Sequence, residues 1–239
     1  MSSTTWTPLA VSSEARAWAA PAWRIVEAQH VASTMKIVDD AAEQDVLELL
    51  LETIKPPQPS SVSRLDHSLA TPFRYDPLRG GSRFRGATDP GVFCGAESVR
   101  TACAELGYWR WKFLRDAVDL ERIEPVPHTA FRVKLAADVV DLRGPPFAND
   151  LSAWTHPTDY STTQAFTRVA REAQIGGIIY PSVRDPEPGW CVALLDPAAF
   201  ASPKPDPTMQ AWWLAVRQDA VVWRRDSERL VFAASPWRT

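Results

Sequence analysis

Proline is the residue that most limits how this chain can fold. Twenty-one prolines are spread through its 239 residues. Each proline fixes its own φ angle and lacks a backbone N–H, so it interrupts helix interiors and central strands. The prolines therefore predict many short segments separated by turns, and they exclude a long helical bundle. Helical and strand patterns are mixed without βαβ regularity, which favours an α+β fold over a doubly wound sheet.

Hydrophobic periodicity predicts three helices. Apolar residues recur at helical spacing over residues 39–54, and the Pro56-Pro57 pair ends that helix. Ser98 is a suitable N-cap for a second helix that runs to about Arg115, and Thr158 for a third that runs to about Gln174. The predicted buried face of the second helix consists of Val99, Ala102, Cys103, Leu106 and Phe113.

Short apolar runs between turn signals predict the strands. They span residues 23–30, 91–94, 131–135, 139–142, 177–180 and 191–195, followed by a hairpin of residues 221–225 and 229–232. Residues 1–20 are rich in Ser, Thr and Ala, and we expect a loose lead-in there. Residues 21–239 are predicted to form a single domain, in which residues 201–239 are a tryptophan-rich C-terminal extension.

Charge and cysteine content restrict the compartment and the partners. A net charge of −3 and a pI of about 5.8 give no reason to expect nucleic acid or an anionic membrane as partner. The three cysteines are odd in number and lack metal-ligand spacing, which fits a reducing cytosol and predicts no metal site. We find neither a signal-peptide pattern nor an apolar run of about 18 residues, so a cytoplasmic protein is expected.

Tryptophan is unusually frequent, with eleven residues. Large rigid rings fill cores and also occur at interfaces. We interpret most of them as core residues. The C-terminal fifth holds Trp212, Trp213, Trp223 and Trp237. That density adds the hypothesis that this region docks a partner or a second copy.

Three residues could carry chemistry, although the standard catalytic and phosphate-binding motifs are absent. Arg83 lies in a turn flanked by glycines, where the backbone can approach a ligand, and its planar guanidinium suits phosphate oxygens. Glu105 lies at the edge of the apolar face of the second helix. Ser182 follows a buried strand. Taken singly, each has an ordinary structural explanation.

Together these residues resemble the RES-domain family, which is named after an Arg-Glu-Ser triplet. The matching segments are GSRF with Arg83, the strand-end aromatic Phe93, the AE that ends at Glu105, and YPSVRDP with Ser182. Their order and character agree across residues 23–200. The Trp23-Arg24 pair is similar to an early aromatic-arginine strand of the family, which makes Arg24 a further candidate.

The resemblance implies a fold and a substrate. Family members have a compact mixed sheet with flanking helices, similar to ADP-ribosyltransferases, and they consume NAD. The implied role of Glu105 is to stabilise an oxocarbenium-like ribose. Arg83, assisted by Arg24, would hold the pyrophosphate, and Ser182 would orient the ribose or nicotinamide. NAD is expected as the substrate, with no further cofactor and no metal.

One position departs from the family pattern. The strand-end aromatic is usually tyrosine, and here it is Phe93, which can stack on nicotinamide but supplies no hydroxyl. The spacing from Phe93 to Glu105 is also one residue longer than usual. Tyr75 and Tyr180 are the candidates to supply the missing hydroxyl.

The sequence leaves three functions open. The first is an NAD phosphorylase or glycohydrolase that acts as the toxin of a bacterial toxin–antitoxin pair. The second is a mono-ADP-ribosyltransferase that modifies a protein, and the third is a decayed binding module for nucleotide or protein. The resemblance also implies a helix-turn-helix antitoxin as partner and inorganic phosphate as one acceptor. Self-association is a separate hypothesis.

Overall fold

One eight-stranded sheet forms the frame of the computed structural model, which describes residues 5–28, 40–75 and 81–238. The strand order is β1-β2-β5-β4-β3-β6-β7-β8, and β3–β4 is the one parallel pair among these strands. The strands are β1 (Arg16–Glu27), β2 (Phe93–Ala96), β3 (Ile123–Asp141), β4 (Gly177–Pro181), β5 (Trp190–Leu194), β6 (Gln210–Val216), β7 (Ala220–Arg225) and β8 (Glu228–Ala233).

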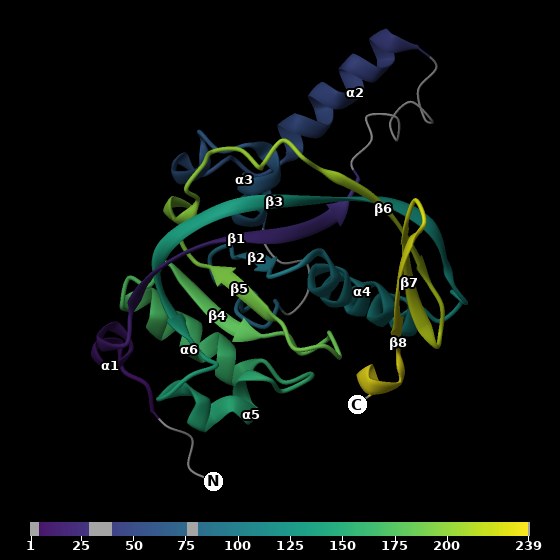
Figure 1. Ribbon diagram of the computed structural model, residues 1–239. Helices are drawn as coiled ribbons and strands as arrows, with labels where there is room; N and C mark the ends of the chain where they lie inside the picture. The colour runs from purple at the N-terminus through teal and green to yellow at the C-terminus, as the bar shows by residue number, and fades with distance from the viewer. Residues whose placement is uncertain (1–4, 29–39, 76–80, 239) are drawn as a thin grey trace.

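Helices flank this sheet, so the predicted α+β class is confirmed (Figure 1). They are α1 (Pro8–Ser13), α2 (Ala41–Ile54), α3 (His67–Arg74), α4 (Val99–Asp116), α5 (Leu151–Trp154) and α6 (Ser161–Glu172). Short 3-10 turns lie at Ser60–Val62, Phe147–Asp150, Pro197–Ala199 and Ser235–Trp237. No helix in the described part of the chain is long and apolar enough to cross a bilayer.

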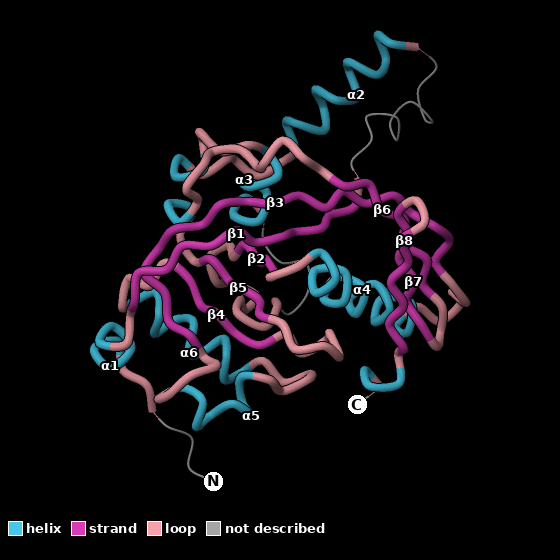
Figure 2. The backbone as a smooth tube through the Cα atoms, viewed as in Figure 1, coloured by secondary structure: helices cyan, strands magenta, loops and turns pink. Residues whose placement is uncertain are grey.

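Strand β1 closes the sheet on itself. It pairs along its full length with β3, and it also meets β2 through the Trp23↔Ala96 pair. The pairings β1–β2, β2–β5, β5–β4, β4–β3 and β3–β1 therefore form a closed circuit. Figure 2 shows β1 and β3 running side by side as the longest strands of the molecule.

Strand β3 replaces the two strands predicted over residues 131–135 and 139–142. It is one strand of 19 residues. The intervening Ala136, Ala137 and Asp138 have no strand pattern of their own, but each pairs with a residue of β1. Pairing with a partner strand thus determines the backbone conformation of residues whose local sequence indicates no strand.

Helix α4 has the predicted bounds and cap, but part of its predicted buried face is wrong. The Ser98 side chain accepts a hydrogen bond from the Thr101 N–H at 3.1 Å, which confirms the N-cap. Ala102 and Cys103 are buried as expected, whereas Phe113 is 58% exposed. The buried face is instead continued by Gly107, Tyr108, Trp111 and Leu114, because α4 packs against β1, β2, β6, β7 and β8.

Two predicted element starts are also wrong. The expected loose lead-in over residues 1–20 contains α1, whose Val11 is fully buried, and the first part of β1. The expected helix at Thr158 begins only at Ser161, after an N-cap at Tyr160. The backbone N–H groups of Thr158 and Asp159 donate to the His156 imidazole instead, which holds these residues in a turn. The predicted strand end at residues 29–30 lies outside the described residues.

Residues 210–233 of the predicted C-terminal extension form strands β6, β7 and β8 of the sheet. Trp212, Trp223 and Trp237 are buried, and Trp213 is 51% exposed. The Trp223 indole donates to the Cys103 carbonyl of α4 at 3.1 Å. The predicted hairpin is confirmed as β7 and β8, whereas β6 was not predicted.

The buried position of Trp223 predicts a large stability difference between two aromatic substitutions. Trp223→Ala should lower the free energy of unfolding by about 3–5 kcal/mol, because it leaves a cavity and an unpaired carbonyl. Phe113→Ala should change it by only about 0.5–1 kcal/mol, since that ring is mostly exposed. Urea denaturation of both variants measures this, and equal losses would contradict the placement of α4.

Candidate functional site

A cavity of about 260 Å³ lies between α4 and strands β1, β2, β4 and β5. Most of its wall is apolar or aromatic. Its charged lining residues are Arg24 of β1, Arg83, Glu105 of α4, and Arg184. The lining thus contains three arginines and one carboxylate, and the direction of each side chain determines what the cavity can bind.

Glu105 is held by one of its two carboxylate oxygens. Its Oε1 accepts a hydrogen bond from the Ser182 hydroxyl at 2.6 Å and another from the Val183 N–H at 3.2 Å. The Cys191 thiol approaches the same oxygen at 3.8 Å. No described residue donates to Oε2. The carboxylate is thus fixed in orientation while one oxygen stays available to a ligand.

Ser182 positions the carboxylate and is not among the residues that line the cavity. Its hydroxyl oxygen accepts hydrogen bonds from the backbone N–H groups of Arg184, at 3.4 Å, and Asp185, at 3.2 Å. The hydroxyl proton is consequently directed to Glu105. The structure thus brings the predicted residues Ser182 and Glu105 into direct contact, with Ser182 holding the Glu105 carboxylate in place.

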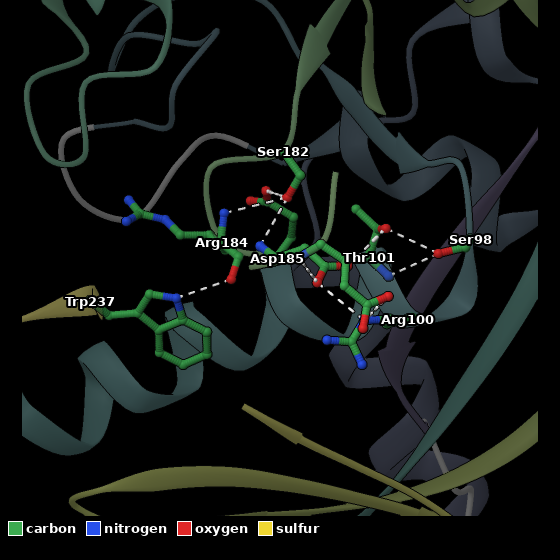
Figure 3. A network of polar contacts seen from close by, with 9 residues as sticks. Ser98, Arg100, Thr101, Ser182, Arg184, Asp185 and Trp237 are labelled. Atoms are coloured by element: carbon green, nitrogen blue, oxygen red, sulfur yellow. Dashed lines mark hydrogen bonds and ion pairs between the residues drawn. The ribbon is translucent and has the colours of Figure 1, made fainter. Parts of the chain in front are cut away.

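A polar network anchors the loop that carries Ser182 (Figure 3). The Asp185 carboxylate, 1% exposed, accepts from Arg100 at 3.2 Å and from the Thr101 hydroxyl at 3.1 Å. Both donors belong to the first turn of α4, where a carboxylate is also favoured by the helix dipole. From the C-terminal end of the chain, the Trp237 indole donates to the Arg184 carbonyl at 3.1 Å. The loop is therefore tied to two parts of the fold.

Arg83 reaches the cavity from a tight turn. Gly81 adopts a φ of +85°, and a Cβ there would lie 1.9 Å from the Arg85 carbonyl oxygen, so this turn requires glycine. One terminal nitrogen of Arg83 donates to the carbonyls of Trp154 and His156, both at 2.9 Å. Its guanidinium carbon lies 4.7 Å from the Tyr160 ring centre. Among the described residues, the other guanidinium nitrogens have no acceptor.

Arg184 is a candidate that the sequence interpretation missed. Its guanidinium stacks 3.4 Å from the Tyr108 ring centre, and one terminal nitrogen donates to the Pro157 carbonyl and the Tyr160 hydroxyl. Arg83 and Arg184 thus both donate to the same segment, residues 154–160. The sequence signal that could have identified Arg184 was its position in YPSVRDP, two residues after Ser182.

Arg24 lines the cavity, as predicted, but its guanidinium interacts mainly with residues of the neighbouring strand β2. It donates to the Cys94 carbonyl at 2.8 Å, and its guanidinium lies 4.8 Å from the centre of the Phe93 ring. Its Nε is buried without a partner. Burial also lowers the pKa of Arg24.

Phe93 is not in the cavity, so the prediction that it stacks on nicotinamide is corrected. It is fully buried on the other face of the sheet and packs against Phe200 at 4.9 Å between ring centres. Side chains alternate along a strand, and the next residue, Cys94, lines the cavity.

Of the two tyrosines proposed as hydroxyl donors, only one lies at the cavity. Tyr180 lines the cavity, whereas Tyr75 does not. Tyr180 is buried, and burial raises its pKa well above the usual value, so it stays protonated. Tyr160 is a further hydroxyl in the lining, and its proton is directed to the Pro157 carbonyl at 3.2 Å.

The site offers anion-binding groups rather than a metal-ligand set. Within residues 5–28, 40–75 and 81–238, no three His, Cys, Asp or Glu side chains are grouped to hold a metal ion. The guanidinium groups of Arg83 and Arg184 are suited to phosphate oxygens. The expectation of no metal and no further cofactor stays a prediction.

These features define a mixed α+β protein with a cationic cavity around one anchored carboxylate. A family comparison matches the RES domain over residues 60–216, which is more than half of the chain. The protein therefore belongs to the RES-domain family, as the motif resemblance predicted. No curated protein matches the chain.

A solved structure has a similar but distant fold. It is the crystal structure of the M. tuberculosis MbcT–MbcA toxin–antitoxin complex, with 13% sequence identity and a TM-score of 0.44. The similarity covers 94% of this chain and 90% of that chain. At this identity and score it carries no further weight for function.

The buried thiols predict slow chemical modification of the native protein. Burial raises the pKa of Cys94, Cys103 and Cys191, so each stays a neutral thiol near pH 7, and the thiolate fraction increases only as pH rises. A small alkylating reagent should label at most Cys94, which is only half-buried, and more slowly than free cysteine, whose pKa is about 8.5. Mass spectrometry of native and unfolded protein tests this. Rapid labelling of all three cysteines in the native state would contradict the structure.

Proposed function

We propose that this protein cleaves the bond between nicotinamide and ribose in NAD, as the toxin of a bacterial toxin–antitoxin pair. The observation that carries the proposal is the orientation of Glu105. Ser182 and Val183 fix one carboxylate oxygen by hydrogen bonds. The other oxygen receives no hydrogen bond from a described residue, and Glu105 lines a cavity that three arginines also line. Membership of the RES-domain family supports the same substrate.

The fixed carboxylate suits a reaction that generates positive charge. Departure of nicotinamide leaves an oxocarbenium-like centre on the ribose, and both electrons of the broken bond go to the nicotinamide nitrogen. A carboxylate about 4 Å away would stabilise that centre by roughly 4 kcal/mol at an effective dielectric near 20. If this stabilisation is realised only in the transition state, it accelerates the reaction about a thousandfold. Glu105 is the group placed to provide it.

The arginines suit the pyrophosphate. Arg83 and Arg184 bring two positive charges to the cavity, which match the two negative charges of the pyrophosphate diester. Arg83 and Arg184 each use one terminal nitrogen for backbone or tyrosine oxygens. Their remaining N–H groups have no described acceptor and are free to bind phosphate oxygens.

The size of the cavity suggests which half of NAD it takes. Its volume of about 260 Å³ is smaller than the roughly 300–1,000 Å³ of typical ligand pockets. The nicotinamide riboside half would be enclosed beside Glu105, with the pyrophosphate at the arginines and the adenosine half toward solvent. Trp109 and Tyr160, whose ring centres are 6.3 Å apart, provide aromatic surface for the bound rings.

Ser182 and the acceptor complete the mechanism. Ser182 acts by keeping Glu105 in one orientation, which is a positioning role. The acceptor for the ribose is water or inorganic phosphate, and a protein side chain would give the alternative mono-ADP-ribosyltransferase. The partner is a helix-turn-helix antitoxin that blocks the cavity, as the family resemblance implies.

Glu105→Gln should lower the rate of NAD consumption about a thousandfold, because it removes the charge that stabilises the transition state. The matched control is Glu121→Gln, an exposed carboxylate outside the cavity, which should retain full activity. Nicotinamide release by purified protein, with and without phosphate, measures the rate. The mass of the ribosyl product identifies the acceptor. Equal activity of Glu105→Gln and wild type would refute the proposed role.

Arg184→Gln should weaken NAD binding and leave a phosphate-free substrate unaffected. Losing a charge-assisted hydrogen bond of about 1.5–3 kcal/mol raises KM for NAD roughly 10–100-fold. For nicotinamide riboside, which has no phosphate, KM should change little. Steady-state kinetics with both substrates gives the comparison. An equal rise in both KM values would indicate that Arg184 only supports the fold of the cavity wall.

A further inference from the structure

Trp237, near the C-terminal end of the chain, contacts the loop that carries Ser182. Its side chain is buried, and the indole N–H donates to the Arg184 carbonyl at 3.1 Å. Figure 3 shows the indole below the backbone of this loop and Ser182 above it. Trp237 lies outside the matched RES domain, residues 60–216, and the proposed reaction gives it no role.

One rigid peptide group connects Trp237 to Ser182. The Arg184 carbonyl, which accepts from the indole, belongs to the same planar group as the Asp185 N–H. That N–H donates to the Ser182 hydroxyl oxygen at 3.2 Å, and the hydroxyl donates to Oε1 of Glu105 at 2.6 Å. The indole, the peptide group and the hydroxyl therefore form a continuous chain of hydrogen bonds that ends on the carboxylate.

All the hydrogen bonds of this chain have the same direction. An indole N–H can only donate, and a peptide group has a fixed donor and a fixed acceptor. The Ser182 proton is therefore left to Glu105. Hydrogen bonds aligned in this way polarise one another, so a donor at the start of the chain strengthens the bond at its end.

A second aromatic residue of the C-terminal segment supports the same loop. Phe232 of β8 is buried and stacks on Trp237, with ring centres 6.4 Å apart. The Arg100 guanidinium lies 5.0 Å from the centre of the Phe232 ring and forms an ion pair with Asp185 at 3.2 Å. The stacked rings thus support Arg184 through its carbonyl and Asp185 through its carboxylate.

Packing alone would not require an indole at this position. The Trp237 ring lies 5.8 Å from the Tyr108 ring and 6.0 Å from the Trp111 ring, between ring centres. A phenylalanine could make such ring contacts as well. What tryptophan adds is the N–H that donates to the loop carbonyl.

We infer that Trp237 is a positioning residue for the proposed reaction. It acts through the Arg184–Asp185 peptide group on Ser182, and through Ser182 on the Glu105 carboxylate. The inference rests on the proposed cleavage of NAD, and it makes the C-terminal segment part of the machinery of the site.

Trp237→Phe removes the indole donor and keeps an aromatic ring. Because Glu105 acts in the transition state, kcat for NAD should fall about tenfold. The Arg184 guanidinium keeps its own contacts with Tyr108 and Pro157, so KM should change less than about twofold. Trp213→Phe is the matched control at an exposed tryptophan and should change neither constant. Steady-state nicotinamide release measures both.

A double-mutant cycle separates positioning from a general loss of folded protein. In a Ser182→Ala background the hydrogen-bond chain is already broken, so Trp237→Phe should lower kcat by less than about twofold. A merely structural role of Trp237 would lower kcat equally in both backgrounds. Urea denaturation checks that each variant is folded under the assay conditions.

Amide hydrogen exchange tests the same chain without NAD. The N–H groups of Val183, Arg184 and Asp185 donate to Glu105 or Ser182, so Trp237→Phe should accelerate their exchange about tenfold and leave the amides of β5 unchanged.

The two measurements fail in different ways. A wild type that releases no nicotinamide would refute the proposed function, and the exchange rates alone would then decide whether Trp237 positions Ser182. In an active protein, an unchanged kcat, an equal fall of kcat in both backgrounds, or unchanged exchange of the three loop amides would overturn the inference.

Discussion

The hydrogen bonds to Oε1 of Glu105 connect the two halves of the candidate site. The Ser182 hydroxyl and the Val183 N–H come from the loop after β4, whereas Glu105 lies on α4, 77 residues earlier in the chain. The same loop is fixed to the first turn of α4 through Asp185 and to the C-terminal end of the chain through Trp237. The orientation of the carboxylate therefore depends on the packing of α4 and on the C-terminal strands.

The charges around the cavity determine what the oriented Glu105 carboxylate can do chemically. Arg83 and Arg184 brace the segment that carries Tyr160, and each keeps donors for a ligand. A carboxylate beside several guanidinium groups can bind a substrate with an anionic part and a centre that becomes cationic. An adjacent apolar wall favours a flat, uncharged leaving group. These properties follow from the residues in contact, whichever acceptor completes the reaction.

The sequence predicted the long helices and most strands, but it missed α1, α3 and β6, and it did not predict every side chain that faces the cavity. Arg24, Arg83 and Glu105 line it as predicted, because strand ends, a glycine turn and a helix edge are local features. Phe93 was wrong by one position, and strand alternation makes such an error place a side chain on the opposite face. Arg184 was missed because its contacts with Tyr108 and Tyr160 join segments far apart in sequence. The long strand β3 and the early start of β1 likewise depend on partner strands.

A structure of the Glu105→Gln variant with bound NAD would test the account most directly. The account predicts the ribose C1′ within about 4 Å of the Gln side chain at position 105, the distance at which the wild-type carboxylate would stabilise a cationic centre strongly. It also predicts the pyrophosphate on Arg83 and Arg184. NAD bound with its nicotinamide riboside outside this cavity, or no binding despite an intact fold, would contradict it.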